Sequence, residues 1–357
     1  MSDNAVPDDI ARALGASDRH AYLEQRLFVL SPFGTLPTTI ILFAAFAGSF
    51  AIAWVISGRP FLVVSDGRLH AGILIWLAFW FSLMLTTALG MQRYSRVKDR
   101  EDIARYAAVL RGGWPSAATM TELTPTRAPL RRANLIGLAV GLVASVLLYA
   151  TGGSQNLLAY PALLIWFAVA TTGLIMTFTR GVALTRSGAR NMRRIIDQEL
   201  LIDLLRIDRL SVIGRSAARP SLVWFTVSAV IFLLFIEGGL TIFTVTLLLA
   251  CAAMGLWVFV ATMEQVHRKI LRVKAAELER LRGEIDAVQV RCAGDADCAV
   301  KLQGLLAYEA RIAAAPEWPF DQTTAVRVGA SVLILTVPWF GQAVAAYVVE
   351  HAGHITG

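Results

Sequence analysis

Long apolar segments alternate with short polar ones along most of the chain. Several reach about 20 residues without an internal charge, the length that an α-helix needs to cross the hydrocarbon core of a bilayer. They are uninterrupted runs, unlike the alternating strands of about ten residues found in a membrane barrel. The pattern therefore predicts an all-α polytopic membrane protein with seven transmembrane helices, at 36–57, 70–91, 135–153, 158–179, 222–236, 240–263 and 325–349.

Short polar turns divide the first six spans into pairs. Residues 151–156 separate the third span from the fourth, and Glu237, Gly238 and Gly239 separate the fifth from the sixth. Glycine-rich turns of this kind join antiparallel helices. We expect three helical hairpins followed by an unpaired seventh span. Small residues four positions apart predict close helix contacts, at Gly137/Gly141, Ala44/Gly48 and Cys251/Gly255.

The distribution of basic residues predicts an orientation. Lys and Arg gather at 93–132 and 180–219, whereas the alternate connections carry few of them apart from Arg59 and Arg68. Basic loops remain in the cytoplasm, so the N-terminus is expected inside and the C-terminus outside. Residues 1–30 are polar, which argues against a cleavable signal peptide and makes the first span its own insertion signal.

Composition agrees with a membrane protein, because 56% of residues are hydrophobic and 17% are charged. The net charge of +7 is mainly a topology signal, and the expected partner of the arginines near the span ends is the bilayer with its anionic headgroups. Nucleic-acid binding is the alternative for a basic chain, but these arginines lie near span ends and lack interleaved aromatic residues. The prevalence of Arg over Lys and the Ala-rich composition suggest a GC-rich bacterium and its inner membrane.

Two polar regions are predicted to be helical. In 193–213, aliphatic residues recur at helical spacing, which indicates an amphipathic helix that packs on its neighbours or lies among the headgroups. These residues are Ile196, Leu200, Leu204, Ile207 and Leu210.

The expected division of the chain has four parts. They are a cytoplasmic segment at 1–35, a six-helix region at 36–263 with cytoplasmic helices at 92–134 and 180–220, a cytoplasmic helical hairpin at 264–324, and the last helix with an exterior tail at 325–357.

The hairpin at 264–324 begins with a short coiled-coil pattern. Heptad positions are occupied by Leu271, Leu278, Leu281, Ile285 and Val288. Lys274 interrupts this seam, and a polar turn then leads to a second helical stretch. Cys292 and Cys298 bracket the turn, where a disulfide bridge or a metal site is the alternative to two incidental thiols. A zinc site would need further Cys or His ligands nearby.

The seventh span has a sequence reason to be considered for function. Pro338 near its midpoint removes a backbone hydrogen bond and predicts a kink or break at bilayer depth. Broken helices often line cavities, because their freed carbonyls need protein or water partners. One face carries the predicted pore-lining or gating residues Ser331, Leu335, Pro338, Gln342 and Ala345. The alternative is a kinked packing helix that uses Gly341 and Ala345 for close approach.

Several chemistries have no sequence support. The spans contain no lysine for a retinal Schiff base, and a P-loop, a paired-histidine zinc motif and a nucleophile elbow are absent. The five histidines form no ligand constellation within one apolar segment, so no enzyme activity, cofactor or metal is expected. Glu237 is interpreted as a solvated turn residue, with an intramembrane proton or cation carrier as the alternative.

Two function classes remain. The first is a homo-oligomeric, channel-like assembly with the last span along the conduction path, and the second is a non-conducting scaffold or signalling protein whose cytoplasmic helices recruit a protein partner. In arrangement alone, with seven spans, an internal N-terminus and a cytoplasmic helical anchor before the last span, the chain resembles the insect chemoreceptor channels. The resemblance covers no sequence motif, and it implies a pore-lining last helix.

Overall fold

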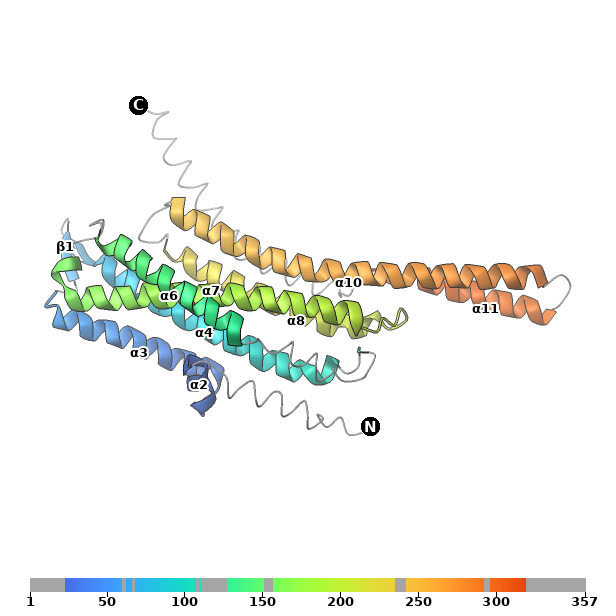
Figure 1. The fold of residues 1–357 in the computed structure, drawn as a ribbon, viewed down its shortest axis with the longest axis horizontal. Coiled ribbons are helices and arrows are strands. Elements are labelled where there is room, and N and C mark those ends of the chain that lie inside the picture. Colours follow the sequence, from blue (N-terminus) through green and yellow to red (C-terminus); the bar gives the residue numbers. More distant parts are fainter. Residues whose placement is uncertain are drawn as a thin grey trace, which may run out of the picture.

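The computed structural model describes residues 23–59, 62–65, 68–106, 109–110, 127–150, 157–234, 242–291 and 296–318. These residues are nearly all helical, as the sequence predicts (Figure 1). The α-helices are α2 (Leu23–Leu30), α3 (Thr35–Ile56), α4 (Ile73–Tyr106), α6 (Arg127–Ala150), α7 (Pro161–Gln198), α8 (Ser211–Phe232), α10 (Ile242–Arg291) and α11 (Ala296–Ala313), with short 3-10 helices η1 (Leu157–Ala159) and η2 (Ile207–Leu210).

Apolar helices long enough to cross a membrane are confirmed. The described part of the chain contains five such helical segments: Thr35–Ile56, Ile73–Asp99, Pro129–Tyr149, Pro161–Gln198 and Thr246–Val290. The predicted fifth span falls partly in α8, which is not among them because its first half carries Arg215 and Arg219. The predicted seventh span, at 325–349, lies outside the described residues. Seven spans and their orientation therefore remain predictions.

A short β-hairpin departs from the all-helical expectation. Strands β1 (Leu62–Ser65) and β2 (Arg68–Ala71) pair antiparallel in the connection between α3 and α4. The second predicted span therefore begins at Ile73 and not at 70, because Arg68–Ala71 belongs to the hairpin. Pairing the two strands satisfies backbone groups in the connection between these two helices.

Three helices continue well beyond their apolar parts. Predicted spans end at Met91, Thr179 and Met263, but α4, α7 and α10 run on as single helices to Tyr106, Gln198 and Arg291. Figure 1 shows the far ends of α4 and α7 on the same side of the bundle, with the pair α10 and α11 extending past them. We call this side, which carries Arg93, Arg105, Arg186 and Arg219, the basic end.

Glycine determines how closely α6 approaches α7. A Cβ atom added at Gly137 would lie 2.6 Å from the Met176 Cα, and one at Gly141 would lie 2.8 Å from the Thr172 Cα. Both neighbours are backbone atoms, so the two helices touch along this pair as predicted. Gly255 likewise packs against α8, where the nearest atom is Phe225 Cε1 at 3.1 Å. Gly48 differs, because an added Cβ meets nothing within 4 Å among the described residues, which therefore supply no partner for the predicted Ala44/Gly48 contact.

Aromatic residues fill the opposite end of the bundle. Trp54, Trp166 and Phe167 are buried together with Phe50, whose ring lies 5.0 Å from that of Trp166. Trp166 Nε1 donates to Ser49 Oγ at 2.9 Å, which pairs a polar atom that would otherwise be stranded between helices. Between this cluster and the basic end, Trp80 Nε1 donates to the Val230 carbonyl at 2.7 Å and ties α4 to α8.

The glycine contacts predict a measurable difference between two matched variants. Gly141→Leu should push α6 away from α7 and lower the free energy of unfolding by about 1–3 kcal/mol, the usual cost of overpacking. Gly48→Leu makes the same change where an added side chain meets open space. Thermal unfolding of the purified protein in detergent should separate the two, and equal melting temperatures would contradict the α6–α7 packing.

Candidate functional site

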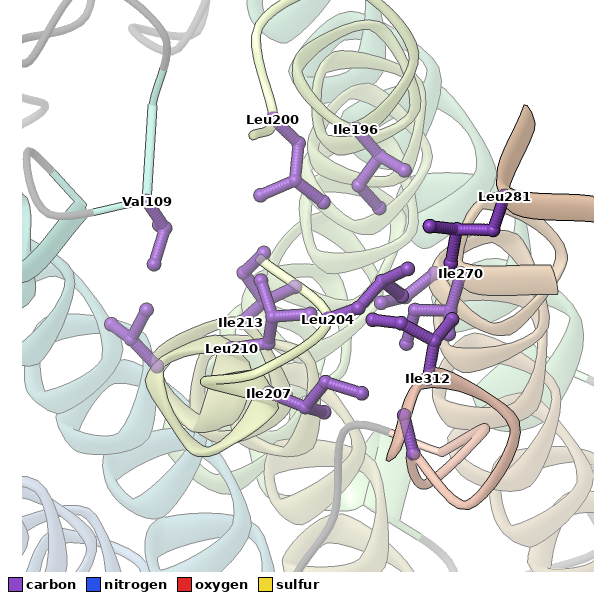
Figure 2. Close-up of a cluster of buried hydrophobic side chains, with 13 residues drawn as sticks. Val109, Ile196, Leu200, Leu204, Ile207, Leu210, Ile213, Ile270, Leu281 and Ile312 are labelled. Carbon is purple, nitrogen blue, oxygen red and sulfur yellow. The ribbon is translucent and has the colours of Figure 1, made fainter. Parts of the chain in front are cut away.

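Aliphatic side chains from distant parts of the chain meet at the basic end in one buried core. Figure 2 shows residues from the end of α7, the start of α8, α10 and α11 pointing toward one another. Ile196, Ile270 and Ile312, from α7, α10 and α11, have exposed fractions of 0%, 0% and 1%. We call this core the junction; its buried members are Val109, Ile196, Leu200, Leu204, Ile207, Leu210, Val212, Ile213, Val266, Ile270, Leu281, Ile312 and Ala315.

The chain between α7 and α8 contributes to the junction without being one helix. All five aliphatic residues predicted to share an amphipathic helix are buried in this core. However, α7 ends at Gln198 and residues 199–206 are irregular, so the predicted continuous helix over 193–213 is wrong. The backbone instead finds partners in the segment after α4, where Leu201 N donates to the Val109 carbonyl at 2.9 Å and Leu200 bridges Leu110.

The helical hairpin expected after residue 264 is present. It consists of α10 from residue 264 onward and of α11, and we call these two helical segments the arm. Leu281, Ile285 and Val288 are buried and Leu278 packs on the junction, as the heptad pattern predicts. Closer to the bundle the pattern fails, because Leu271 is 37% exposed. The buried positions there are Val266 and Ile270, since α10 turns a different face toward the end of α7.

Two lysines of α10 bind the ends of the helices that pack on it. Lys269 Nζ donates to the Ile196 carbonyl and, at 3.0 Å, to the Asp197 carbonyl in the last turn of α7. Lys274 Nζ donates to the Ala315 carbonyl at 3.1 Å, just after α11 ends. The last carbonyls of a helix lack intrahelical partners and carry partial negative charge, so an ammonium group stabilises them. Lys274 interrupts the apolar seam because it caps α11.

The residues after α11 are held against α10. The rings of His267 and Trp318 are stacked, with centroids 4.1 Å apart and an interplanar angle of 6°. His267 Nδ1 lies 2.8 Å from the Glu317 carbonyl oxygen, which can only accept, so Nδ1 carries the proton. Lys274 Nζ also lies 3.3 Å from Glu317 Oε1. We call these four side chains, His267, Lys274, Glu317 and Trp318, the latch.

An ionic cluster around the buried Asp102 joins α4 to α8 at the same end. Asp102, with a side chain only 1% exposed, pairs with Arg219 and with Arg105 at 2.6 Å. Arg219 also reaches Asp99 at 2.6 Å. Nearby, burial raises the pKa of Tyr106, opposed by a hydrogen bond with Ser216, so the phenol stays protonated. The cluster fixes α4 against α8, because a buried carboxylate deprived of its cation is costly.

The predicted pore-lining residues belong to a segment outside the part of the chain that the structure describes. Ser331, Leu335, Pro338, Gln342 and Ala345 all lie outside the described residues, as does Glu237. The pairing of Cys292 with Cys298 also falls there. Sequence reasoning missed the latch and the ionic cluster, whose members lie 50 and 117 residues apart in the chain and share no local pattern.

Neither a metal site among the described residues nor a match to a known protein indicates a chemical activity. Among the described residues, no three His, Cys, Asp or Glu side chains are arranged to hold a metal ion. No family model matches the chain, and no curated protein or solved structure matches it either. The resemblance to the insect chemoreceptor channels therefore gains no support from these comparisons. The main feature of the described residues is structural: the arm packs against the helical bundle at the junction.

The capping lysines lead to a test of the arm. Lys274→Met should leave the Ala315 carbonyl unpaired and weaken the attachment of α11 by about 1.5–3 kcal/mol, the usual range for a hydrogen bond to a charged group. Hydrogen exchange of the backbone amides in residues 296–318 should then speed up while that of α6 stays unchanged.

Arg272→Met is the matched control, because Arg272 is on the same helix but its side chain is 71% exposed and its carboxylate partner is 3.8 Å away. Equal exchange rates in the two variants would show that Lys274 does not hold the end of α11.

Proposed function

We propose that this protein is an integral membrane protein, channel-like and homo-oligomeric, in which the arm is coupled to the membrane-embedded helices through the junction. The observation that carries the proposal is the unbroken α10, which runs for 50 residues from Ile242 in its apolar part to Arg291 at the tip of the arm. A helix transmits a displacement along its axis, whereas a flexible linker would absorb it. The continuity of this helix therefore supports the proposed coupling.

The return of the chain supports the same proposal. After α11, the latch holds Trp318 against His267, four residues beyond Met263 and so roughly 6 Å along the α10 axis. The predicted last span starts at 325, a few residues further on. In the proposal, a movement of α11 along α10 would move Trp318, from which the chain leads on to that span. Such an element could bias an open and a closed arrangement of a proline-broken helix.

The orientation of this arrangement follows from charge. Basic residues gather at the end of the bundle that carries the junction, and basic loops stay in the cytoplasm. We therefore expect the protein in the inner membrane of a bacterium, with the arm on the cytoplasmic side. In the channel form of the proposal, the face with Ser331, Pro338 and Gln342 lines the path of an oligomer, and its mainly apolar wall would gate by dewetting.

The second candidate is a non-conducting scaffold that recruits a protein partner through the arm. The projection of α10 and α11 beyond the other helices favours it (Figure 1). A recruiting module needs only a tether, however, and gains nothing from a rigid helix and a capped return. The rigid connection is what makes coupling the better supported of the two.

Ion flux through liposomes that contain the full-length protein tests the proposal. Pro338→Ala and Gln342→Leu should change the conductance, because they alter the predicted broken face. Lys274→Met should change the fraction of time that the path is open without changing the unitary conductance, because it loosens the latch and not the pore.

Arg272→Met serves as the control here too and should conduct like the unaltered chain. Silence across voltage and ligand conditions, together with binding of a cytoplasmic protein to residues 264–315, would instead establish the scaffold. Images of the purified particle add an independent criterion, since a monomer would remove the oligomeric pore.

A further inference from the structure

Arginines continue the face of α7 that packs on α6. Thr172, Met176 and Thr179 lie on this face and contact α6 at Gly141 and Gly137. Continuing the same heptad spacing leads to Arg186, Arg190 and Arg193, which are all exposed. Positions separated by three, four and seven residues share one side of a helix. The α7 face is thus covered where α6 lies on it and cationic further on.

The start of α6 adds two more cations close to where the contact between α6 and α7 ends. Ala133 of α6 lies beside Thr179 of α7, whose hydroxyl donates to the Ala133 carbonyl at 3.2 Å. Arg131 and Arg132 immediately precede this contact and are exposed. Within the described part of the chain, none of these five arginines forms an ion pair with a carboxylate, unlike Arg219 in the buried cluster or the arginines of the arm. Their charges are uncompensated there.

An apolar surface begins where the arginines end. From Leu135 onward, α6 exposes large aliphatic side chains over the faces that do not contact α7; Leu135, Ile136, Val140, Val143 and Val146 are each at least half exposed. The boundary between cation and hydrocarbon therefore falls within four residues, from Arg131 to Leu135. A ligand that matches both surfaces must be anionic at one end and long and apolar at the other, as a phospholipid is.

We propose that Arg186, Arg190 and Arg193, together with Arg131 and Arg132, bind the phosphates of an anionic lipid whose acyl chains lie along α6. The row from Arg186 to Arg193 extends roughly 10 Å along the helix, which is longer than one phosphate and suits a headgroup with two. Guanidinium groups bind phosphate oxygens through paired hydrogen bonds, so they suit this ligand better than ammonium groups would. This inference rests on the membrane location in the proposed function, but not on ion conduction.

The test uses the full chain in detergent, with cardiolipin as the two-phosphate probe and phosphatidylglycerol and phosphatidylcholine for comparison. Cardiolipin should raise the melting temperature most, and native mass spectrometry should detect it bound. The triple variant Arg186→Gln, Arg190→Gln, Arg193→Gln should weaken cardiolipin binding roughly a hundredfold, since each arginine near anionic lipid contributes about fivefold.

The matched control removes three charges from the arm, as Arg272→Gln, Arg280→Gln, Arg282→Gln, and should bind cardiolipin like the unaltered chain. An equal loss in both triple variants would overturn the site in favour of nonspecific charge, and tight binding of a soluble polyphosphate with no preference for lipid would overturn it in favour of a soluble anionic partner. Membrane integration is checked separately by resistance to carbonate extraction. If the protein resists extraction but shows no lipid preference, only this inference is contradicted. If carbonate extracts the protein, the proposed function is contradicted as well.

Discussion

The burial of aliphatic side chains at the junction determines how the arm sits on the bundle. Ile196, Ile270 and Ile312 come from three different helices and are removed almost completely from solvent. In water, burying each such side chain is worth about 1.5–3 kcal/mol. Helices surrounded by lipid gain little from this effect, because lipid tails are as apolar as the side chains. Different forces therefore act in the two parts of the molecule. Hydrophobic burial holds the arm to the bundle at the junction, and close backbone contact holds α6 to α7 within the bundle.

Charged groups then set the position of the arm more exactly than hydrophobic burial can. An aliphatic core tolerates small sliding movements, whereas an ammonium group bonded to particular carbonyls does not. Lys269 and Lys274 of α10 bond to carbonyls at the ends of α7 and α11, so both of these helices are fixed in register with α10. The stacked pair of His267 and Trp318 extends this control to the residues that lead on toward 325.

Much of the helical layout is readable from the sequence, and so are some of its contacts. Gly137 and Gly141 identify a close helix pair because small residues four apart have few other uses in an apolar helix. The same signal at Gly48 meets no partner among the described residues, and spacing alone cannot show whether a neighbour is present. The periodicity of Ile196, Leu200 and Leu204 correctly predicts burial but not the helix, because the chain must reverse between α7 and α8 and side chains can reach one core from an irregular backbone.

The apolar segments, their basic flanks and the helical hairpin of the arm follow from the sequence, because each depends on residues close together in the chain. The junction, the lysine caps, the latch and the pairing of Asp102 with Arg219 were decided only by the tertiary structure. Each of them joins residues that are tens of residues apart or more, and no local period records which helix end will lie beside which lysine. Long-range polar contacts depend on the register of the helices, which is set by how the helices pack against one another.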